Sequence, residues 1–223
     1  MDDGELIAEQ IAYYRARAAE YDATSMPEGD PFAAHGDAIR DALRSFEPRG
    51  RVLEIAAGTG QWTGILADYA DELVVTDASP EMLALNAAKV GEHAHVHRIV
   101  ADAFSLPASH DFDAVLFGFF FSHVPPARFA LFWDVVSGVL APDGRVFFTD
   151  EAWPGVSSEE WIDRAAGVTR RHLLDGSPHR AVKVLWRPDE LQEWLTDLGW
   201  NASVDVEGPF YWGTAARDDG ARS

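Results

Sequence analysis

The sequence predicts an α/β fold in which a parallel β-sheet is covered by helices. Short apolar segments alternate with helical patterns between residues 51 and 149, which is typical of strand–helix–strand units. In addition, the segment Val52–Thr63 places an apolar strand directly before a glycine turn that opens a helix. A turn of that kind is found in nucleotide-binding α/β domains, where the ligand lies against the backbone.

Two helices are expected before the sheet. Glu5–Asp22 carries apolar residues at helical spacing with arginines on its polar side, so it predicts an amphipathic helix. Ala23–Asp30 contains a Pro-Glu-Gly sequence and predicts a loop. Phe32–Phe46 is again helical in pattern until Pro48 and Gly50 end it.

Five strands are expected in the central part of the chain, because each apolar run has strand length and is bounded by turn residues. They are Arg51–Ala56, Leu73–Thr76, Val96–Val100, Ala114–Phe117 and Val146–Thr149.

The alternation breaks after Asp150, where different elements are expected. In chain order these are a helix over Ser158–Leu174, a turn at Asp175–Pro178, a strand near Ala181–Trp186, a helix over Pro188–Leu198 that Gly199 ends, and a hairpin partner for that strand within Ser203–Thr214. We therefore expect an N-terminal helical lid over residues 1–47, one α/β domain over 48–215 and a disordered tail over 216–223.

Composition narrows the class of protein. The chain has 223 residues, a formal net charge of −19 at pH 7 and no cysteine. Such a charge repels nucleic acid phosphates and anionic lipid, and the absence of cysteine excludes disulfides and thiolate chemistry. No apolar run reaches the ~20 residues of a membrane helix, and the acidic N-terminus is unlike a secretion signal. We expect a cytoplasmic protein that binds neither nucleic acid nor membranes.

The glycine turn predicts an adenosine cofactor. Gly58 and Gly60 permit close approach of a ligand, and Asp77 follows the second strand, where a carboxylate can bind both ribose hydroxyls. Asp77 can instead cap the next helix, although Ser79 is available for that role. Glu54 beside the turn repels a pyrophosphate and attracts a cation. The cationic cofactor S-adenosylmethionine (SAM) is thus favoured over a nicotinamide dinucleotide.

Residues after the third strand complete this prediction. Asp102 is placed to accept a hydrogen bond from the adenine amino group, with Met82 and Phe104 as apolar walls, although Asp102 can also be a simple turn residue. A reductase would show a Tyr-x-x-x-Lys pair, and no tyrosine in the sequence has a lysine four positions later.

Glu54-x-x-x-Gly58-x-Gly60, Asp77 and Asp102-Ala103 resemble the motifs of the class I SAM-dependent methyltransferases. The resemblance implies a Rossmann-like sheet of seven strands with the last antiparallel, SAM as cofactor, S-adenosylhomocysteine (SAH) as product, and no metal. The cofactor site that it implies consists of Arg17, Glu54, Ala56, Gly58, Gly60, Trp62, Asp77, Met82, Asp102, Ala103 and Phe104.

Three other parts of the chain, Tyr13–Asp22, His123–Pro125 and Arg170–Asp205, resemble the phosphonate O-methyltransferases of dehydrophos biosynthesis. This resemblance implies an anionic small-molecule acceptor and an O-methyl product. The substrate-binding residues that we expect are Tyr14, Tyr21, Arg171, Arg180 and Lys183, with His123 as an auxiliary catalytic group. Burial of His123 beside its apolar neighbours and ordinary helix packing of the two tyrosines are the alternatives. The sequence departs from these enzymes at Ser25–Gly36, Phe117–Phe121 and Ala152–Asp163.

A cluster of basic residues in this acidic chain also predicts an anion site. Six of the 18 basic residues lie between Arg164 and Arg187, and we expect Arg170, Arg171, Arg180 and Lys183 to converge on one phosphonate, phosphate or carboxylate. The alternative is that these cations pair with nearby carboxylates. Methylation of a carboxylate, hydroxyl or amine, or a SAM-binding regulatory role without turnover, also fits the sequence.

Overall fold

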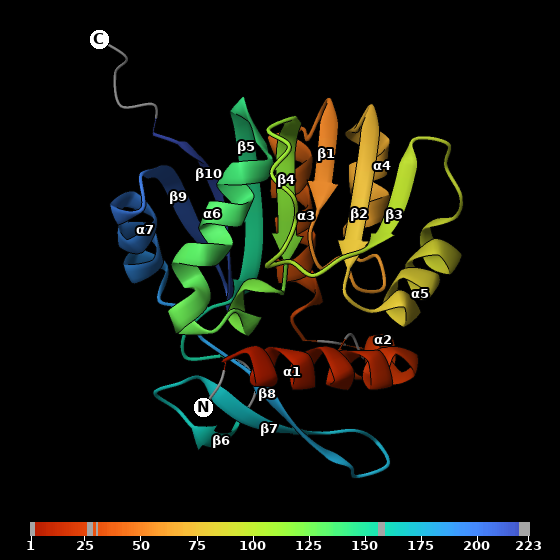
Figure 1. Ribbon diagram of the computed structural model, residues 1–223, viewed down its shortest axis with the longest axis vertical. Helices are drawn as coiled ribbons and strands as arrows, with labels where there is room; N and C mark the ends of the chain where they lie inside the picture. Colours follow the sequence, from red (N-terminus) through yellow and green to blue (C-terminus); the bar gives the residue numbers. More distant parts are fainter. Residues whose placement is uncertain (1–2, 26–28, 30, 156–158, 219–223) are drawn as a thin grey trace.

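The protein is built on a seven-stranded sheet of order β3-β2-β1-β4-β5-β10-β9 (Figure 1). The computed structural model describes residues 3–25, 29, 31–155 and 159–218. The seven strands are β1 (Arg51–Glu54), β2 (Glu72–Asp77), β3 (Val96–Val100), β4 (Phe112–Gly118), β5 (Leu140–Glu151), β9 (Trp200–Glu207) and β10 (Phe210–Arg217). Strands β1 to β5 pair in parallel, and β10 is inserted antiparallel between β5 and β9. The predicted class I sheet is confirmed.

Helices cover both faces of this sheet. On one face lie α3 (Ala33–Phe46), α4 (Thr63–Tyr69) and α5 (Pro80–Val90), and on the other lie α6 (Phe129–Val139) and α7 (Pro188–Asp197). Each face has its own apolar core, one around Leu43 and Leu66 and the other around Phe117 and Trp133. The central strands β1 and β4 are buried on both faces, which explains why they appear in the sequence as continuous apolar runs.

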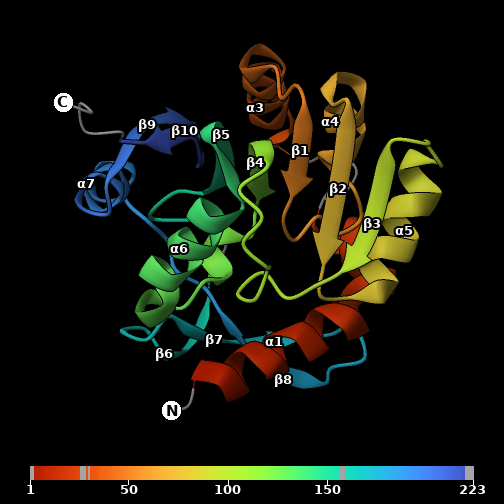
Figure 2. The ribbon, with the colours of Figure 1, turned by 45° about the horizontal axis from the view of Figure 1, so that its top comes forward.

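The N-terminal segment lies across the carboxyl ends of the parallel strands. Helix α1 (Asp3–Arg17) continues through a 3-10 turn (Ala18–Glu20) into the short helix α2 (Tyr21–Ser25). Figure 1 shows α1 between the main sheet and a small second sheet, which α1 overlaps in the view of Figure 2. That sheet consists of β6 (Glu160–Asp163), β7 (Val168–His172) and β8 (Pro178–Val182). The edge of the main sheet where ligands bind in α/β proteins is therefore covered.

Side chains of α1 bind the small sheet and the main domain together. Leu6 packs with Val168 and Val182 in a separate apolar cluster. Gln10, only 5% exposed, accepts a hydrogen bond from the Val182 N–H at 2.8 Å and donates from Nε2 to the His123 carbonyl at 3.1 Å. The buried amide of Gln10 thus joins three elements: α1, β8 and the 3-10 turn Phe121–His123.

The helix expected over Ser158–Leu174 is wrong. The chain forms the antiparallel strands β6 and β7 there, and Gly167 with φ +68° lies between them. Ser158 itself lies outside the described residues. Helical spacing in this segment was overridden by tertiary pairing, because β7 also pairs along its length with β8.

The strand expectations near the C-terminus also need correction. The strand after the Asp175–Pro178 turn begins earlier than expected, at Pro178, and ends at Val182. The last two strands form a hairpin with each other and β10 joins β5, so Ser203–Thr214 is no partner of β8. β10 continues to Arg217, which places residues 216 and 217 in the sheet, whereas residues 219–223 lie outside the described part.

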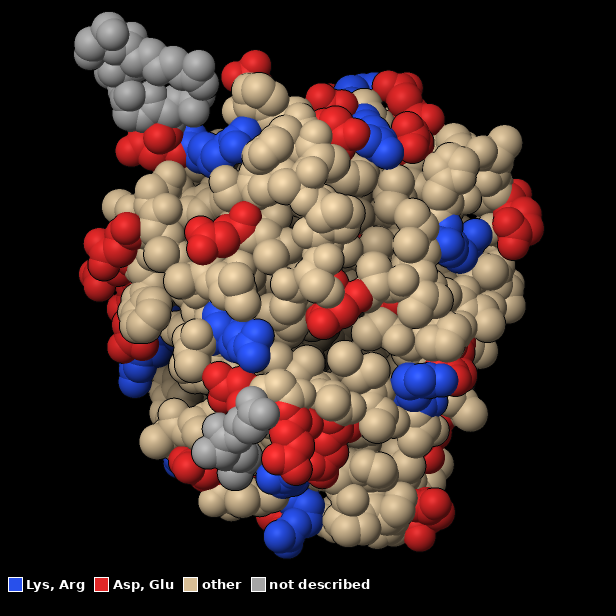
Figure 3. All heavy atoms as spheres, viewed as in Figure 1, with Lys and Arg blue, Asp and Glu red and all other residues tan. Residues whose placement is uncertain are grey.

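The exposed charges are predominantly acidic. Figure 3 shows acidic side chains spread over one face with basic ones between them, so no continuous basic patch covers the described residues of that face. Among the described residues, no helix is long and apolar enough to cross a membrane.

The Gln10 bridge predicts a large effect of Gln10→Ala on stability. Truncation leaves the buried Val182 N–H and the His123 carbonyl without their partner, and each buried unpaired group costs roughly 1–3 kcal/mol. We expect a loss of about 2–3 kcal/mol in the free energy of unfolding, measured by urea denaturation. Gln192→Ala is the control, because Gln192 accepts from the Val204 N–H at an exposed position. Equal losses in the two variants would contradict the bridge.

Candidate active site

The glycine turn after β1 bends sharply. Ala56 and Gly58 have φ of +53° and +54°, the left-handed region that glycine adopts most readily. A Cβ on Gly58 would meet no atom within 4 Å, because this residue borders a pocket. Gly60, by contrast, lies against Asn86 and Val90 of α5, where a Cβ would be 3.0 Å from each side chain. Gly58 therefore opens the pocket, and Gly60 permits helix packing.

Asp77, the last residue of β2, is fixed in place by two backbone groups. Its carboxylate accepts from the Gly58 N–H at 2.9 Å and from the Ser79 N–H at 2.8 Å. Ser79 caps α5 by accepting from the Met82 N–H at 3.1 Å, so Asp77 is not needed as the cap. Burial raises the pKa of Asp77, while the two N–H donors oppose that rise. Each carboxylate oxygen retains a lone pair for a hydroxyl ligand.

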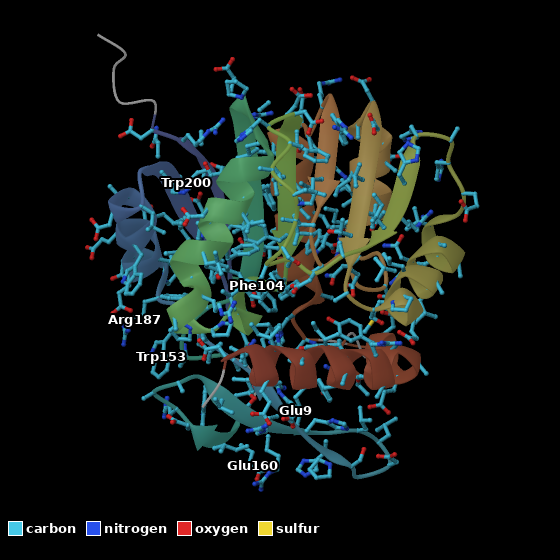
Figure 4. The ribbon with its side chains drawn as sticks, in the orientation of Figure 1. Glu9, Phe104, Trp153, Glu160, Arg187 and Trp200 are labelled. Atoms are coloured by element: carbon cyan, nitrogen blue, oxygen red, sulfur yellow. The ribbon has the colours of Figure 1, made fainter. Side chains whose placement is uncertain are left out.

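A pocket opens between the carboxyl ends of β1, β2 and β4 and the helix α1. Its lining comes from α1, the glycine turn and the segments that follow β2, β3 and β4. It brings together eleven of the residues expected at the site: Tyr14, Tyr21, Ala56, Gly58, Trp62, Asp77, Met82, Asp102, Ala103, Phe104 and His123. Phe104 is labelled at the edge of this region in Figure 4.

One side of the pocket is lined by apolar side chains. Met82 is 2% exposed and Ala103 is 9% exposed, and both line the pocket with Phe104. Asp102 accepts from the Phe104 N–H at 3.0 Å, an Asx turn that fixes its carboxylate. The turn alternative for Asp102 and a role toward an adenine are therefore compatible.

Glu54 departs from its expected position. It is 1% exposed and does not line the pocket, and its carboxylate accepts from Thr63 Oγ1 at 2.6 Å. Thr63 accepts in turn from Asn86, whose side-chain oxygen accepts from Arg98. Burial raises the pKa of Glu54 to about 8, so this carboxyl group is mainly neutral at pH 7. The direct attraction for a cationic ligand expected of Glu54 has no geometric support.

His123 and Tyr14 form a hydrogen-bonded pair at the opposite side of the pocket. His123 Nδ1 lies 2.7 Å from the Val182 carbonyl, which only accepts, so Nδ1 carries the proton. Neutral His123 then accepts at Nε2 from the Tyr14 hydroxyl at 2.9 Å. Burial lowers the pKa of His123 well below its usual value, and Lys183 and Arg171 lower it further. Burial raises the pKa of Tyr14. Both groups are therefore neutral at pH 7.

The basic residues do not converge on one point, contrary to expectation. Arg180 binds Glu9 of α1 at 2.6 Å and Arg170 binds Glu160 at 2.7 Å. In Figure 4, Glu9 and Glu160 lie below the main sheet, away from Phe104. Arg180 and Arg170 serve the packing of the small sheet. The alternative of pairing with carboxylates holds for these two residues.

Lys183 and Arg171 lie near the Tyr14–His123 pair. The Lys183 side chain is 8% exposed and binds Glu151 at 2.7 Å, with Ser122 Oγ at 3.3 Å. Arg171 binds Glu159 at 2.8 Å. Neither cation lines the pocket itself. They are the remaining members of the expected anion site.

Arg17 and Tyr21 are neighbours at the end of α1. The Arg17 guanidinium lies 4.9 Å from the centre of the Tyr21 ring and donates to Thr24 and Ser25 at 2.9 Å. Arg17 does not line the pocket, whereas Tyr21 does. Burial raises the pKa of Tyr21.

Several pocket residues escaped the sequence reasoning. Gln10, Ile7 and Ile11 of α1 line the pocket, as do Phe119 and Phe120 after β4 and Gln61 in the turn. A polar glutamine among the apolar positions of an amphipathic helix was the one available signal for Gln10. The positive φ of Phe119, +54°, has no counterpart in the sequence.

The comparisons with known proteins agree with this geometry. Residues 52–144 match a methyltransferase domain family. The chain is 38% identical to DhpI in the DhpI–SAH complex, with a TM-score of 0.84 over 98% of this chain and 100% of that one. The DhpI–SAM–HEP complex gives 39% identity and a TM-score of 0.81 over 95% and 97%. This protein belongs to the class I SAM-dependent methyltransferases.

A further relative of this methyltransferase is an uncharacterised methyltransferase of Staphylococcus carnosus, strain TM300. It is 25% identical over 208 residues, which cover 92% of this chain and 97% of the relative. The similarity thus extends well beyond the methyltransferase core, into the N-terminal helices and the C-terminal strands.

The cofactor of the methyltransferase is SAM, and the residues of the pocket fit it. The Trp62 indole N–H is buried and has no hydrogen-bond partner among the described residues, although Trp62 lines the pocket. A buried donor without a partner is costly unless a ligand satisfies it. With the anchored Asp77 carboxylate, it supplies the polar groups for a ribose and an amino acid end. The described residues contain no group of ligands suited to a metal.

The raised pKa of Glu54 predicts a pH-dependent stability. Its pKa is about 8 in the folded methyltransferase against an ordinary 4.5, so the folded state holds the extra proton between these pH values. The free energy of unfolding therefore falls as the pH rises from about 4.5 to about 8, and this loss is complete above about 8. Glu54→Gln removes this loss. We therefore expect the free energy of unfolding of Glu54→Gln to rise relative to that of the wild type as the pH increases from 5.5 to 8.5.

Urea denaturation of both proteins at three pH values measures this difference. Glu193→Gln, an exposed position on α7, is the matched control. A constant difference between Glu54→Gln and the wild type across the range would contradict the prediction.

Proposed function

We propose that this methyltransferase O-methylates a small anionic acceptor such as a phosphonate. The observation that carries the proposal is the position of Lys183 and Arg171 beside the Tyr14–His123 pair, next to the pocket that fits SAM. The sequence resemblance to phosphonate O-methyltransferases supports it. So does the overall similarity to DhpI, which has been solved as a complex with SAM and HEP.

The reaction requires little acid–base catalysis from the protein. SAM supplies a sulfonium-bound methyl group that an oxygen attacks in line, so that the carbon–oxygen bond forms as the carbon–sulfur bond breaks, giving a methyl ester and SAH. A phosphonate oxygen is already ionised at neutral pH. The residues of the chain must therefore orient that oxygen, compensate its lost hydration and exclude water. The cover formed by α1 over the strand ends serves this last purpose.

Arg171 and Lys183 have the main role toward the acceptor in this proposal. A guanidinium binds two oxygens of a phosphonate in its plane, and an ammonium adds a point charge. Tyr14 and Tyr21 line the pocket nearby and offer hydroxyl groups. Arg180, bound to Glu9, is not part of the proposed acceptor site.

His123 acts in this proposal as a fixed hydrogen-bond acceptor. Its Nε2 faces the Tyr14 hydroxyl and its ring is held by the Val182 carbonyl. For an ionised acceptor, the pair removes no proton. For a neutral hydroxyl acceptor, which is the second candidate, Tyr14 can pass a proton to His123 Nε2, as general base catalysis requires.

The residues that we propose to hold SAM all line the pocket: Asp77, Gly58, Trp62, Met82, Asp102, Ala103 and Phe104. Asp77 binds the ribose hydroxyls, while Met82, Ala103 and Phe104 enclose the adenine. Arg17, which has no carboxylate partner among the described residues, is positioned by Tyr21 to meet the amino acid carboxylate. A cytoplasmic location and the absence of nucleic acid partners stay predictions from composition.

The acceptor proposal predicts which substrates release SAH. Purified protein with SAM should release SAH on addition of a small phosphonate, and mass spectrometry should detect the monomethyl ester of that phosphonate.

Arg171→Ala should raise KM for the phosphonate at least about tenfold, because a partly buried charged contact is worth roughly 1.5–3 kcal/mol. Arg170→Ala, at the exposed pair with Glu160, is the control. Loss of activity in His123→Ala with an unchanged Lys183→Ala would contradict an anionic acceptor.

The cofactor proposal predicts that Asp77→Asn weakens SAH binding. The amide keeps the shape of the carboxylate but accepts fewer and weaker hydrogen bonds, so we expect about tenfold or greater loss of affinity by titration calorimetry. Asp197→Asn on the exposed end of α7 is the control. Unchanged SAH affinity in Asp77→Asn would remove Asp77 from the site.

A further inference from the structure

The contact between Arg171 and Glu159 is unusual for a proposed anion site. Arg171 Nη2 binds Glu159 at 2.8 Å, and the Glu159 side chain is only 4% exposed. Arg171 Nε is also buried, and it has no hydrogen-bond partner among the described residues. The guanidinium of Arg171 therefore has one nitrogen bound to a buried carboxylate and a second nitrogen without a hydrogen-bond partner among the described residues.

Neither cation of the proposed acceptor site borders the open pocket. Arg171 is held by Glu159 and Lys183 by Glu151, and the pocket lining reaches only as far as Tyr14 and His123 on this side. An anionic acceptor thus approaches cations that already have counter-ions. The acceptor must displace one of these carboxylates or bind the cation together with it.

The Arg171–Glu159 pair is the more accessible of the two ion pairs, through its cation. Glu151 belongs to β5, where it pairs with Phe210 of β10, and its ion pair with Lys183 is less than 10% exposed at both ends. Glu159 lies directly before β6, which begins at Glu160. Arg171, at 25% exposure, is also the more accessible cation.

We infer that Glu159 is an internal competitor for Arg171 and that this competition selects a phosphonate acceptor over a carboxylate. The inference rests on the proposed function, since it assumes that the acceptor is an anion bound at Arg171. Glu159 is then a specificity-determining residue that never contacts the transferred methyl group.

Charge and oxygen number explain the selection. A carboxylate acceptor would exchange one carboxylate for another on Arg171, with no gain in charge or in hydrogen bonds. A phosphonate has three oxygens and up to two charges, so it makes more charge-assisted hydrogen bonds than the group that it replaces.

The test compares matched anions on the full-length protein saturated with SAH. Ethylphosphonate and propionate share one carbon skeleton, and calorimetry or ligand-observed magnetic resonance gives their affinities. We expect Glu159→Gln to bind both more tightly than the wild type, and propionate more so, such that the preference for the phosphonate falls about tenfold. In turnover, KM for a phosphonate should fall while kcat stays within about twofold.

Glu160→Gln is the matched control. Glu160 is the next residue in the chain and binds Arg170 at an exposed pair, and Figure 4 places it away from Phe104 at the pocket. Its preference for the phosphonate should equal that of the wild type. Glu159→Ala, which lacks any side-chain hydrogen bond to Arg171, should repeat the result of Glu159→Gln.

Opposite results would overturn the inference. Weaker binding of both anions by Glu159→Gln would make Glu159 a positioning residue for Arg171, and an unchanged preference would remove it from specificity. In either case the wild type would still bind ethylphosphonate, and the proposed function would stand. A wild type that binds SAH but neither anion would instead overturn the proposed function, and the inference with it.

Discussion

The hydrogen bonds of Gln10 are the constraint on which the acceptor side of this methyltransferase depends. One buried amide accepts from the Val182 N–H and donates to the His123 carbonyl. It therefore fixes α1 relative to both the small sheet and the turn after β4. Because the Val182 carbonyl also orients His123, and His123 in turn meets Tyr14 of α1, these contacts form a closed circuit. The circuit brings the groups proposed for the acceptor to the strand ends.

Burial decides the protonation states around this circuit. His123 is neutral because removing its charge from water is costly, and the nearby cations Lys183 and Arg171 add to that cost. Glu54 is neutral at pH 7 for the same reason, on the other side of the glycine turn. Two of the cations that remain are paired: Lys183 with Glu151 and Arg171 with Glu159. A strongly acidic protein can thus hold cations beside its pocket without presenting a free positive surface.

The sequence predicted the parts of the structure that follow from local patterns. Buried parallel strands such as β1 and β4 are apolar throughout, and Ser79 lies where a helix cap is required. Asp77 and Gly58 meet because both follow neighbouring parallel strands, whose carboxyl ends share one edge of the sheet. The pocket residues of the methyltransferase motifs were therefore accessible to sequence reasoning.

The sequence by itself determined the fold class, most of the expected pocket residues and the family, because each depends on short spacings within strand–turn–helix units. Only the tertiary structure decided the small sheet, the partners of the arginines and the neutral state of His123. Those features depend on which segments pack together. Arg180 binds Glu9 of α1, some 170 residues away, and Arg171 binds Glu159. The sequence shows how many basic residues a segment contains, but not which carboxylates they bind. Their partners are chosen by packing, since only packing decides which carboxylate is close enough to neutralise each one.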